Sequence, residues 1–190
     1  HLIGIGGAGM SVVAELLASR GATVEGSDRE DSAVLEHLRS VGVRVFVGHE
    51  ASHVDPDSVV VVSTAIREDN PELAIARTRG QLVIHRSQAL ALAATGMRFV
   101  GVAGAHGKTS TSGMLAIALA ACGLDPSVAV GGVLPQLGTG AHLGGGDVFV
   151  AEADESDGSF LNYSPAIEIV TNVEPDHLDR YHSREEFEHI

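Results

Sequence analysis

The chain has 190 residues, of which 44% are hydrophobic and only 4% aromatic, and it contains 23 glycines. This composition excludes a disordered chain and is typical of an α/β protein with an aliphatic core. The formal net charge of -13 disfavours non-specific binding to nucleic acid or to an anionic membrane, so any phosphate has to be held by local groups.

The chain begins with a predicted strand, a glycine turn and a helix. Residues 1–5 are apolar, Gly4, Gly6 and Gly9 have the spacing of a dinucleotide-binding turn, and a helix is predicted up to Ser19. In such a turn the backbone N–H groups approach a pyrophosphate. Asp28 follows at the distance where an acid binds a ribose hydroxyl. The pattern fits a dinucleotide, a nucleotide sugar, or a tight turn without a ligand.

Helices and strands then alternate as far as residue 85. Helices are predicted at residues 32–40 and 71–79, and strands at 22–26, 43–47, 59–63 and 82–85. This alternation indicates a mostly parallel sheet with helices on both faces.

A pause in the pattern at residues 94–97 predicts two domains, residues 1–95 and 96–190. The second domain is expected to be incomplete, because a helix-capping signal at residues 183–186 opens a helix that the sequence does not finish.

A second glycine turn follows the predicted strand at residues 98–103 and opens a helix at 107–122. The sequence GAHGKTS, residues 104–110, is typical of a phosphate-binding loop. Lys108 is expected to reach the β- and γ-phosphates, and the Thr109 hydroxyl to ligate magnesium. The usual pattern has a glycine where Val102 stands. Gly104 supplies the early glycine instead, in a shortened variant.

The remaining elements are predicted strands at residues 127–130, 147–153 and 166–172, with a glycine-rich loop at 131–146. Cys122 is the single cysteine, which excludes an intramolecular disulfide, and its apolar surroundings predict a buried side chain. The sequence has no long apolar run and no N-terminal signal, so a cytoplasmic protein is expected.

Acidic and histidine side chains follow two of these strands. Glu152 ends an apolar strand and is expected beside the phosphate loop, where a carboxylate can hold magnesium. Asp154 and Asp157 fit either a functional role or a solvated acidic loop. His177 follows the last strand and fits either a metal ligand or a surface histidine.

Five stretches, in chain order, resemble the Mur ligase family. They are HLIGIGGAGMS (residues 1–11), VVVVSTAIREDNPEL (59–73), GAHGKTST (104–111), AEADESDGSFL (151–161) and VTNVEPDHLDRY (170–181). Members of that family have a UDP-sugar domain, a central ATPase domain and a C-terminal domain. The resemblance covers the first domain and the start of the second. It implies an α/β fold with two Rossmann-like or P-loop parallel-sheet domains, the second incomplete.

The resemblance also implies a reaction. An ATP-dependent ligase would join L-alanine to the carboxylate of UDP-N-acetylmuramate through an acyl phosphate, with ATP and Mg²⁺, in peptidoglycan precursor synthesis. The substrate-binding residues implied are Gly4, Gly6, Gly7, Ala8, Gly9, Ser27, Asp28, His49, Ser63 and Thr64. The ATP-binding residues implied are Gly104, Ala105, His106, Gly107, Lys108, Thr109 and Ser110.

Within the same resemblance, Lys108, Glu152 and His177 are the implied catalytic residues, and Thr109, Glu152 and His177 the metal ligands. The family usually has threonine where Ala105 stands, so this loop lacks a hydroxyl but keeps its backbone donors. A sister ligase that adds a preformed peptide to the same UDP-sugar shares much of the pattern. The first glycine turn also fits an NAD-dependent oxidoreductase or a non-catalytic nucleotide-sugar-binding module.

Overall fold

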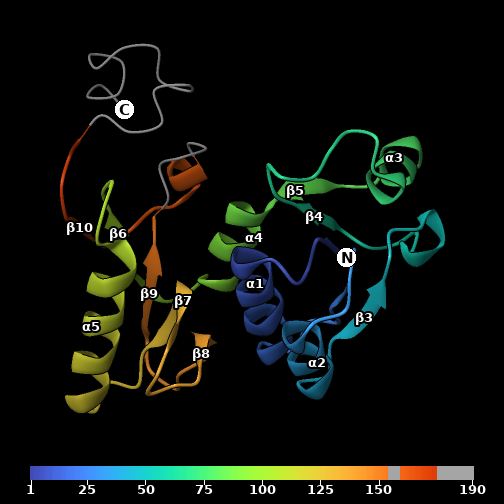
Figure 1. Cartoon of the computed structure of the whole chain (residues 1–190). Coiled ribbons are helices and arrows are strands. Elements are labelled where there is room, and N and C mark those ends of the chain that lie inside the picture. The colour runs from blue at the N-terminus through green and yellow to red at the C-terminus, as the bar shows by residue number, and fades with distance from the viewer. Residues whose placement is uncertain (154–158, 175–190) are drawn as a thin grey trace. The chain divides into compact units, whose positions relative to one another are not determined.

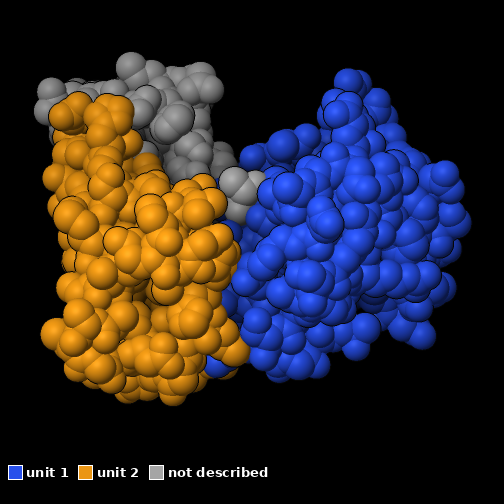
Figure 2. Space-filling view, turned by 60° about the horizontal axis from the view of Figure 1, so that its bottom comes forward, with its two compact units in different colours: residues 1–93 blue, residues 94–190 orange. Residues whose placement is uncertain are grey.

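The computed structural model describes residues 1–153 and 159–174. Two compact units divide the chain, His1–Ala93 and Ala94–Ile190, and Figure 2 colours them separately. Within the described residues each unit contains one five-stranded sheet (Figure 1). None of the helices in these residues is long and apolar enough to cross a membrane.

The sheet of the first unit is entirely parallel, with strand order β3-β2-β1-β4-β5. This confirms the parallel sheet predicted from the alternating pattern. Its strands are β1 (Leu2–Ile3), β2 (Glu25–Asp28), β3 (Arg44–Val47), β4 (Val60–Val62) and β5 (Val83–His85).

Four helices and a short 3-10 turn accompany this sheet: α1 (Ala8–Ser19), α2 (Ala33–Ser40), η1 (Ala51–His53), α3 (Pro71–Thr78) and α4 (Arg86–Ala93). The side chain of Ser32 caps α2, and Asn70 caps α3 ahead of a proline at the first helical position. Helix α1 contacts α2 and α4, whereas α3 packs against Ile3 and Val60 of the sheet. Helices therefore cover both faces.

Gly26 lets β1 and β2 lie unusually close together. A Cβ atom at this position would stand 2.4 Å from the backbone oxygen of Leu2 and 2.7 Å from Cδ1 of Ile5. Since Leu2 and Gly26 are register partners, only glycine fits the pairing that carries the first glycine turn.

The sheet of the second unit has strand order β10-β6-β9-β7-β8. Four strands are parallel, and β8 joins the edge as the antiparallel partner of β7. Helix α5 (Lys108–Ala121) packs on this sheet through Leu115, Ala116 and Leu119. The remaining elements are β6 (Arg98–Ala103), β7 (Ser127–Leu134), β8 (Thr139–His142), β9 (Val148–Glu152), η2 (Ser159–Asn162) and β10 (Ile167–Val170).

The glycine-rich loop predicted at residues 131–146 is wrong, because β7 continues to Leu134 and β8 lies inside the same segment. A Cβ atom on Gly140 would stand 2.5 Å from the backbone oxygen of Val130. The glycines here allow two strands to pair closely. The prediction failed because loops are also rich in glycine. Helix α4 is an element that the sequence pattern did not predict.

The buried position predicted for Cys122 is also wrong, since its side chain is exposed. Cys122 is the C-cap of α5 and lies within an exposed stretch, residues 121–125. Three other predictions lie outside the described residues: the helix-capping signal at residues 183–186, the functional or solvated character of Asp154 and Asp157, and the metal role of His177.

Candidate nucleotide-binding sites

The predicted substrate residues gather at the carboxyl edge of the first sheet. The glycine turn follows β1, Asp28 ends β2, His49 lies two residues after β3, and Ser63 and Thr64 directly follow β4. A Cβ atom on Gly4 would stand 3.1 Å from Cδ1 of Ile66, so the segment after β4 touches the turn. This edge is where parallel α/β sheets bind ligands.

Hydrogen bonds to β2 fix the glycine turn. The N–H groups of Gly4 and Ile5 both donate to the backbone oxygen of Ser27, at 2.8 and 2.9 Å. The N–H of Gly6 donates to Oδ2 of Asp28 at 2.8 Å. Gly4 has a φ of 76°, which favours glycine. Asp28 thus holds the turn itself in this structure.

The N-terminus of α1 presents N–H groups that the helix does not use. The helical hydrogen bonds begin with Met10 and Ser11, which both donate to the backbone oxygen of Gly7. The N–H groups of Ala8 and Gly9 precede this ladder, where an anion is favoured.

Arg86, the first residue of α4, reaches the same place. A Cβ atom on Gly9 would stand 2.8 Å from Nη1 of Arg86, so the guanidinium lies against the beginning of α1. Its positive charge and planar donors suit a phosphate group. The prediction from sequence missed Arg86. The available signal was a basic residue directly after a strand.

A histidine cluster, formed by three histidines around the buried carboxylate of Glu72, lies next to this edge. Glu72 is 0% exposed. Its Oε1 accepts the N–H of Glu50 at 3.3 Å and lies 3.2 Å from Nδ1 of His53. Its Oε2 accepts the hydroxyl of Ser27 and lies 3.3 Å from Nδ1 of His49. His1 approaches the same oxygen, with its Nε2 at 3.5 Å.

The carboxylate of Glu72 is kept ionised by these partners. Burial acts to raise the pKa of Glu72. The nearby imidazole of His1, the hydroxyl of Ser27 and the imidazole of His49 outweigh burial and hold that pKa below its ordinary value. The hydroxyl of Ser27 and the ring of His49 are therefore engaged inside the protein. The sequence did not single out Glu72, His1 or His53.

The second unit forms a phosphate-loop geometry between β6 and α5. Gly104 and Gly107 have φ values of 127° and 84°, and Gly107 is the N-cap of α5. The first helical hydrogen bond runs from the N–H of Thr111 to the oxygen of Gly107 at 2.9 Å. The N–H groups of Lys108, Thr109 and Ser110 precede it and are placed as an anion requires.

Lys108 belongs to this loop, and Glu152 ends the strand next to β6. The Nζ of Lys108 donates to the backbone oxygen of Gly104 at 2.7 Å. Glu152 ends β9 and is the register neighbour of Val102, the penultimate residue of β6. Its Oε1 accepts the N–H of Gly131 at 2.9 Å. Glu152 therefore lies at the end of the strand that neighbours β6, the strand that leads into the phosphate loop.

Two residues with oxygen atoms suited to magnesium, Thr109 and Glu152, border this corner. A Cβ atom on Gly132 would stand 3.1 Å from Cγ2 of Thr109, and Gly131 contacts Glu152, so both side chains border the same glycine pair. A hydroxyl and a carboxylate are ligands that Mg²⁺ accepts. No group of three His, Cys, Asp or Glu side chains within residues 1–153 and 159–174 could hold a metal ion. Thr109 and Glu152 would form only part of a coordination shell.

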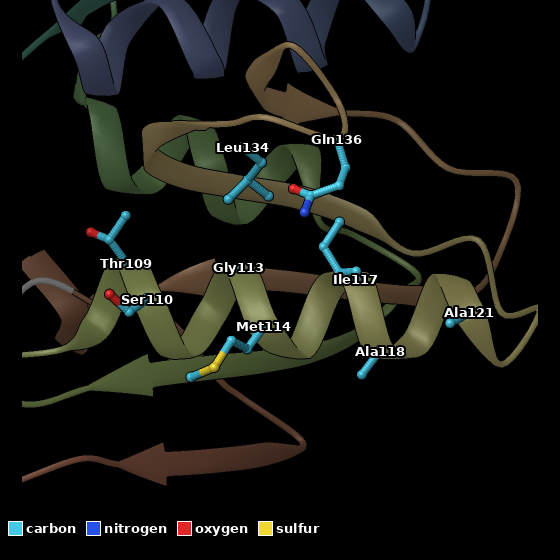
Figure 3. Close-up of a pocket in the computed structure, with 9 residues that line it drawn as sticks. All are labelled: Thr109, Ser110, Gly113, Met114, Ile117, Ala118, Ala121, Leu134 and Gln136. Atoms are coloured by element: carbon cyan, nitrogen blue, oxygen red, sulfur yellow. The ribbon is translucent and has the colours of Figure 1, made fainter.

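A pocket of about 560 Å³ runs along α5 beside the loop (Figure 3). Thr109 and Ser110 lie at one end, and Leu134 and Gln136 come from β7 and the turn after it. The helix side of the pocket is lined by small or apolar residues, namely Gly113, Met114, Ile117, Ala118 and Ala121. Beyond Thr109 this lining suits apolar groups rather than phosphate.

Comparison with known proteins identifies the family. Residues 1–98 match the model described as the Mur ligase family, catalytic domain. The chain belongs to the Mur ligase family. Residues 102–189 match the Mur ligase middle domain, and the resemblance predicted from five sequence stretches is confirmed.

Two curated relatives carry the same name. Proteins of Renibacterium salmoninarum and Streptomyces griseus, both named UDP-N-acetylmuramate--L-alanine ligase, are each 56% identical to this Mur ligase chain. The alignments cover 97% and 98% of the chain but 40% of each relative. The chain therefore spans about 40% of the length of these relatives.

Solved Mur ligase structures have the same fold. UDP-N-acetylmuramate-alanine ligase from Thermotoga maritima is 34% identical with a TM-score of 0.88, over 98% of this chain and 44% of that one. A ligase from Neisseria meningitides, described as acting on UDP-N-acetylmuramate and L-alanyl-gamma-D-glutamyl-meso-diaminopimelate, is 28% identical with a TM-score of 0.87, over 98% and 66%. The fold alone does not separate these two kinds of ligase.

Proposed function

We propose that this chain supplies the UDP-sugar-binding unit and residues of the ATP-binding unit of a ligase that joins L-alanine to UDP-N-acetylmuramate. The observation that carries the proposal is the 56% identity, over 97% of the chain, to a relative named for that reaction. The geometry supports it, because each unit has a glycine turn at a helix N-terminus, one for each phosphate-bearing substrate.

In the first unit, the diphosphate of the UDP-sugar would bind the N–H groups of Ala8 and Gly9, with Arg86 supplying positive charge. Gly4, Gly6 and Gly7 shape the turn. The nucleotide side would be bordered by the residues that follow the neighbouring strands, namely Ser27, Asp28, His49, Ser63 and Thr64.

In the second unit, the ATP phosphates would bind the loop from Gly104 to Ser110, with Lys108 leaving the oxygen of Gly104 to reach the β- and γ-phosphates. Thr109 and Glu152 would hold Mg²⁺, which neutralises phosphate charge when bound. We propose His177, which lies outside the described residues, as a further metal ligand near the substrate carboxylate.

The proposed chemistry has two steps. The carboxylate of UDP-N-acetylmuramate attacks the γ-phosphorus of ATP, the bond to ADP breaks, and an acyl phosphate forms. The amine of L-alanine then attacks the acyl carbon, phosphate leaves, and the nitrogen loses a proton as the amide forms. Because two anions have to meet, the main tasks of Lys108 and the loop N–H groups are to position the phosphates and to neutralise their charge. With ATP as a substrate, we place the reaction in the cytoplasm.

A first test uses the fact that Lys108 is the only lysine in the chain. An amine-reactive reagent applied to the 190-residue chain labels one side chain, and peptide mass spectrometry measures its rate. We expect ATP with magnesium to slow the labelling of Lys108 severalfold, and NAD to leave it unchanged. Equal labelling with and without ATP would contradict the assignment of the loop.

A second test measures ADP release by the full-length enzyme with UDP-N-acetylmuramate and single amino acids. L-alanine should support turnover, Lys108→Ala should abolish it, and Glu152→Gln should raise the magnesium requirement. Arg77→Ala, which removes an exposed charge paired with Glu68, is the matched control and should behave as wild type. Turnover only with a preformed peptide would favour the second kind of ligase, with which the chain shares a TM-score of 0.87.

A further inference from the structure

Two residues that follow β10 contact the phosphate loop. The hydroxyl of Thr171 lies 2.6 Å from the backbone oxygen of His106 and 3.1 Å from that of Ala103. The amide of Asn172 donates to the oxygen of His106 at 2.8 Å and accepts its N–H at 3.2 Å. The residues after β10 therefore contact a loop that lies 65 and 66 residues earlier in the sequence.

The contact with Asn172 is bidentate. A side-chain amide has one acceptor and two donors, and here it pairs with both the N–H and the C=O of a single residue, His106. This fixes the two peptide planes that flank His106. The N–H of His106 is therefore engaged by Asn172, whereas those of Lys108, Thr109 and Ser110 precede the first helical hydrogen bond and can face a phosphate.

Thr171 and Gly104 fit one another closely. A Cβ atom on Gly104 would stand 2.1 Å from Oγ1 of Thr171 and 3.0 Å from the backbone N of Asn172. Gly104 also has a φ of 127°, a conformation that side chains disfavour. The glycine at this position is thus explained by the strand end that packs on it, as well as by an approaching phosphate.

We infer that Thr171 and Asn172 are positioning residues, which hold the phosphate loop in its anion-binding conformation through His106. They need not touch the nucleotide. A loop held in this way loses less conformational entropy when the phosphates bind, so the two residues raise the affinity for ATP. This role rests on the proposed function, since it assumes that ATP is the ligand of the loop.

The test compares variants of the full-length enzyme by steady-state kinetics. Asn172→Ala should raise KM for ATP about tenfold, as expected for the loss of two hydrogen bonds. Thr171→Val should raise it severalfold, and Thr171→Ser, which keeps the hydroxyl, should restore it. KM for the UDP-sugar should stay unchanged, as should both constants in Glu168→Gln, an exposed control on β10.

Hydrogen exchange separates this inference from the proposed function. In the absence of any nucleotide, Asn172→Ala should speed amide exchange in peptides that contain His106 and leave peptides from the first unit unchanged. That result would support the positioning role even if wild-type enzyme failed to use ATP. The positioning role would be overturned if peptides containing His106 exchanged at the wild-type rate in Asn172→Ala. An equal rise in KM for ATP and for the UDP-sugar would also overturn it.

Discussion

Replacing Glu72 tests the buried cluster behind the first glycine turn. Glu72→Ala removes a fully buried carboxylate and leaves the hydroxyl of Ser27 and the N–H of Glu50 without their acceptor. Breaking such a buried charged network costs about 3–5 kcal/mol. Glu72→Gln keeps one oxygen, which can stay opposite the N–H of Glu50. The hydroxyl of Ser27 can rotate to accept from the new amide, so the expected loss is about 1–3 kcal/mol.

The cluster also predicts a pH dependence. The pKa of Glu72 in the folded protein is below its ordinary value of 4.5. The ionised carboxylate therefore makes its full contribution to the stability of the first unit above that pH. The contribution is lost as the pH falls through the lowered folded pKa, because the unfolded chain then takes up the proton first. The stability of the first unit should therefore fall more steeply below pH 4.5 in wild type than in Glu72→Gln.

The measurement is urea unfolding of the 190-residue chain followed by circular dichroism, at several pH values, with hydrogen exchange to identify the first unit. Glu30→Gln removes an exposed carboxylate from the same unit and is the control. If Glu72→Ala lowered the unfolding free energy no more than Glu30→Gln does, the cluster would contribute nothing to stability. If the unfolding free energy of Glu72→Gln fell with decreasing pH as steeply as that of wild type, other groups would set the pH dependence.

Three further substitutions have defined outcomes. Gly26→Ala should lower the unfolding free energy of the first unit by at least about 2 kcal/mol in the same urea experiment, since the new Cβ overlaps the backbone of Leu2. Gly104→Ala should abolish the protection of Lys108 by ATP, while UDP-sugar binding stays intact. Arg86→Ala should weaken UDP-sugar binding about tenfold in calorimetry, as for the loss of one charged hydrogen bond, with Arg86→Lys intermediate. Unchanged values in any of these would contradict the corresponding contact.

The elements around both glycine turns could be predicted because local signals agree there. The strand Arg98–Ala103 was predicted with its observed ends, and Ser32 and Pro71 mark the starts of their helices through capping and a fixed backbone angle. Helix α4 was missed because alternating Ala and Leu in its second half have no clear helical period. The β7–β8 hairpin was missed because glycine indicates a loop as readily as a close strand pairing.

The candidate site was predictable where a residue type and its spacing carry the chemistry. Lys108 and Thr109 were predicted from the phosphate-loop pattern, and Glu152 from its place at the carboxyl end of a strand. In the structure Glu152 ends the strand next to β6, and Thr109 and Glu152 border the same glycine pair. Glu72 was not predictable, since its partners come from three separate segments, and an acid in the first turn of a helix is ordinarily exposed. The role of Asn172 likewise depends on tertiary contact with His106.

Ser27 belongs to two hydrogen-bond networks at once. Its backbone oxygen accepts the N–H groups of Gly4 and Ile5, and its hydroxyl donates to Glu72. A shift of this one residue would displace the glycine turn and the histidine cluster together. The backbone of Ser27 thus supports the glycine turn while its side chain supports Glu72, so the two networks meet in one residue.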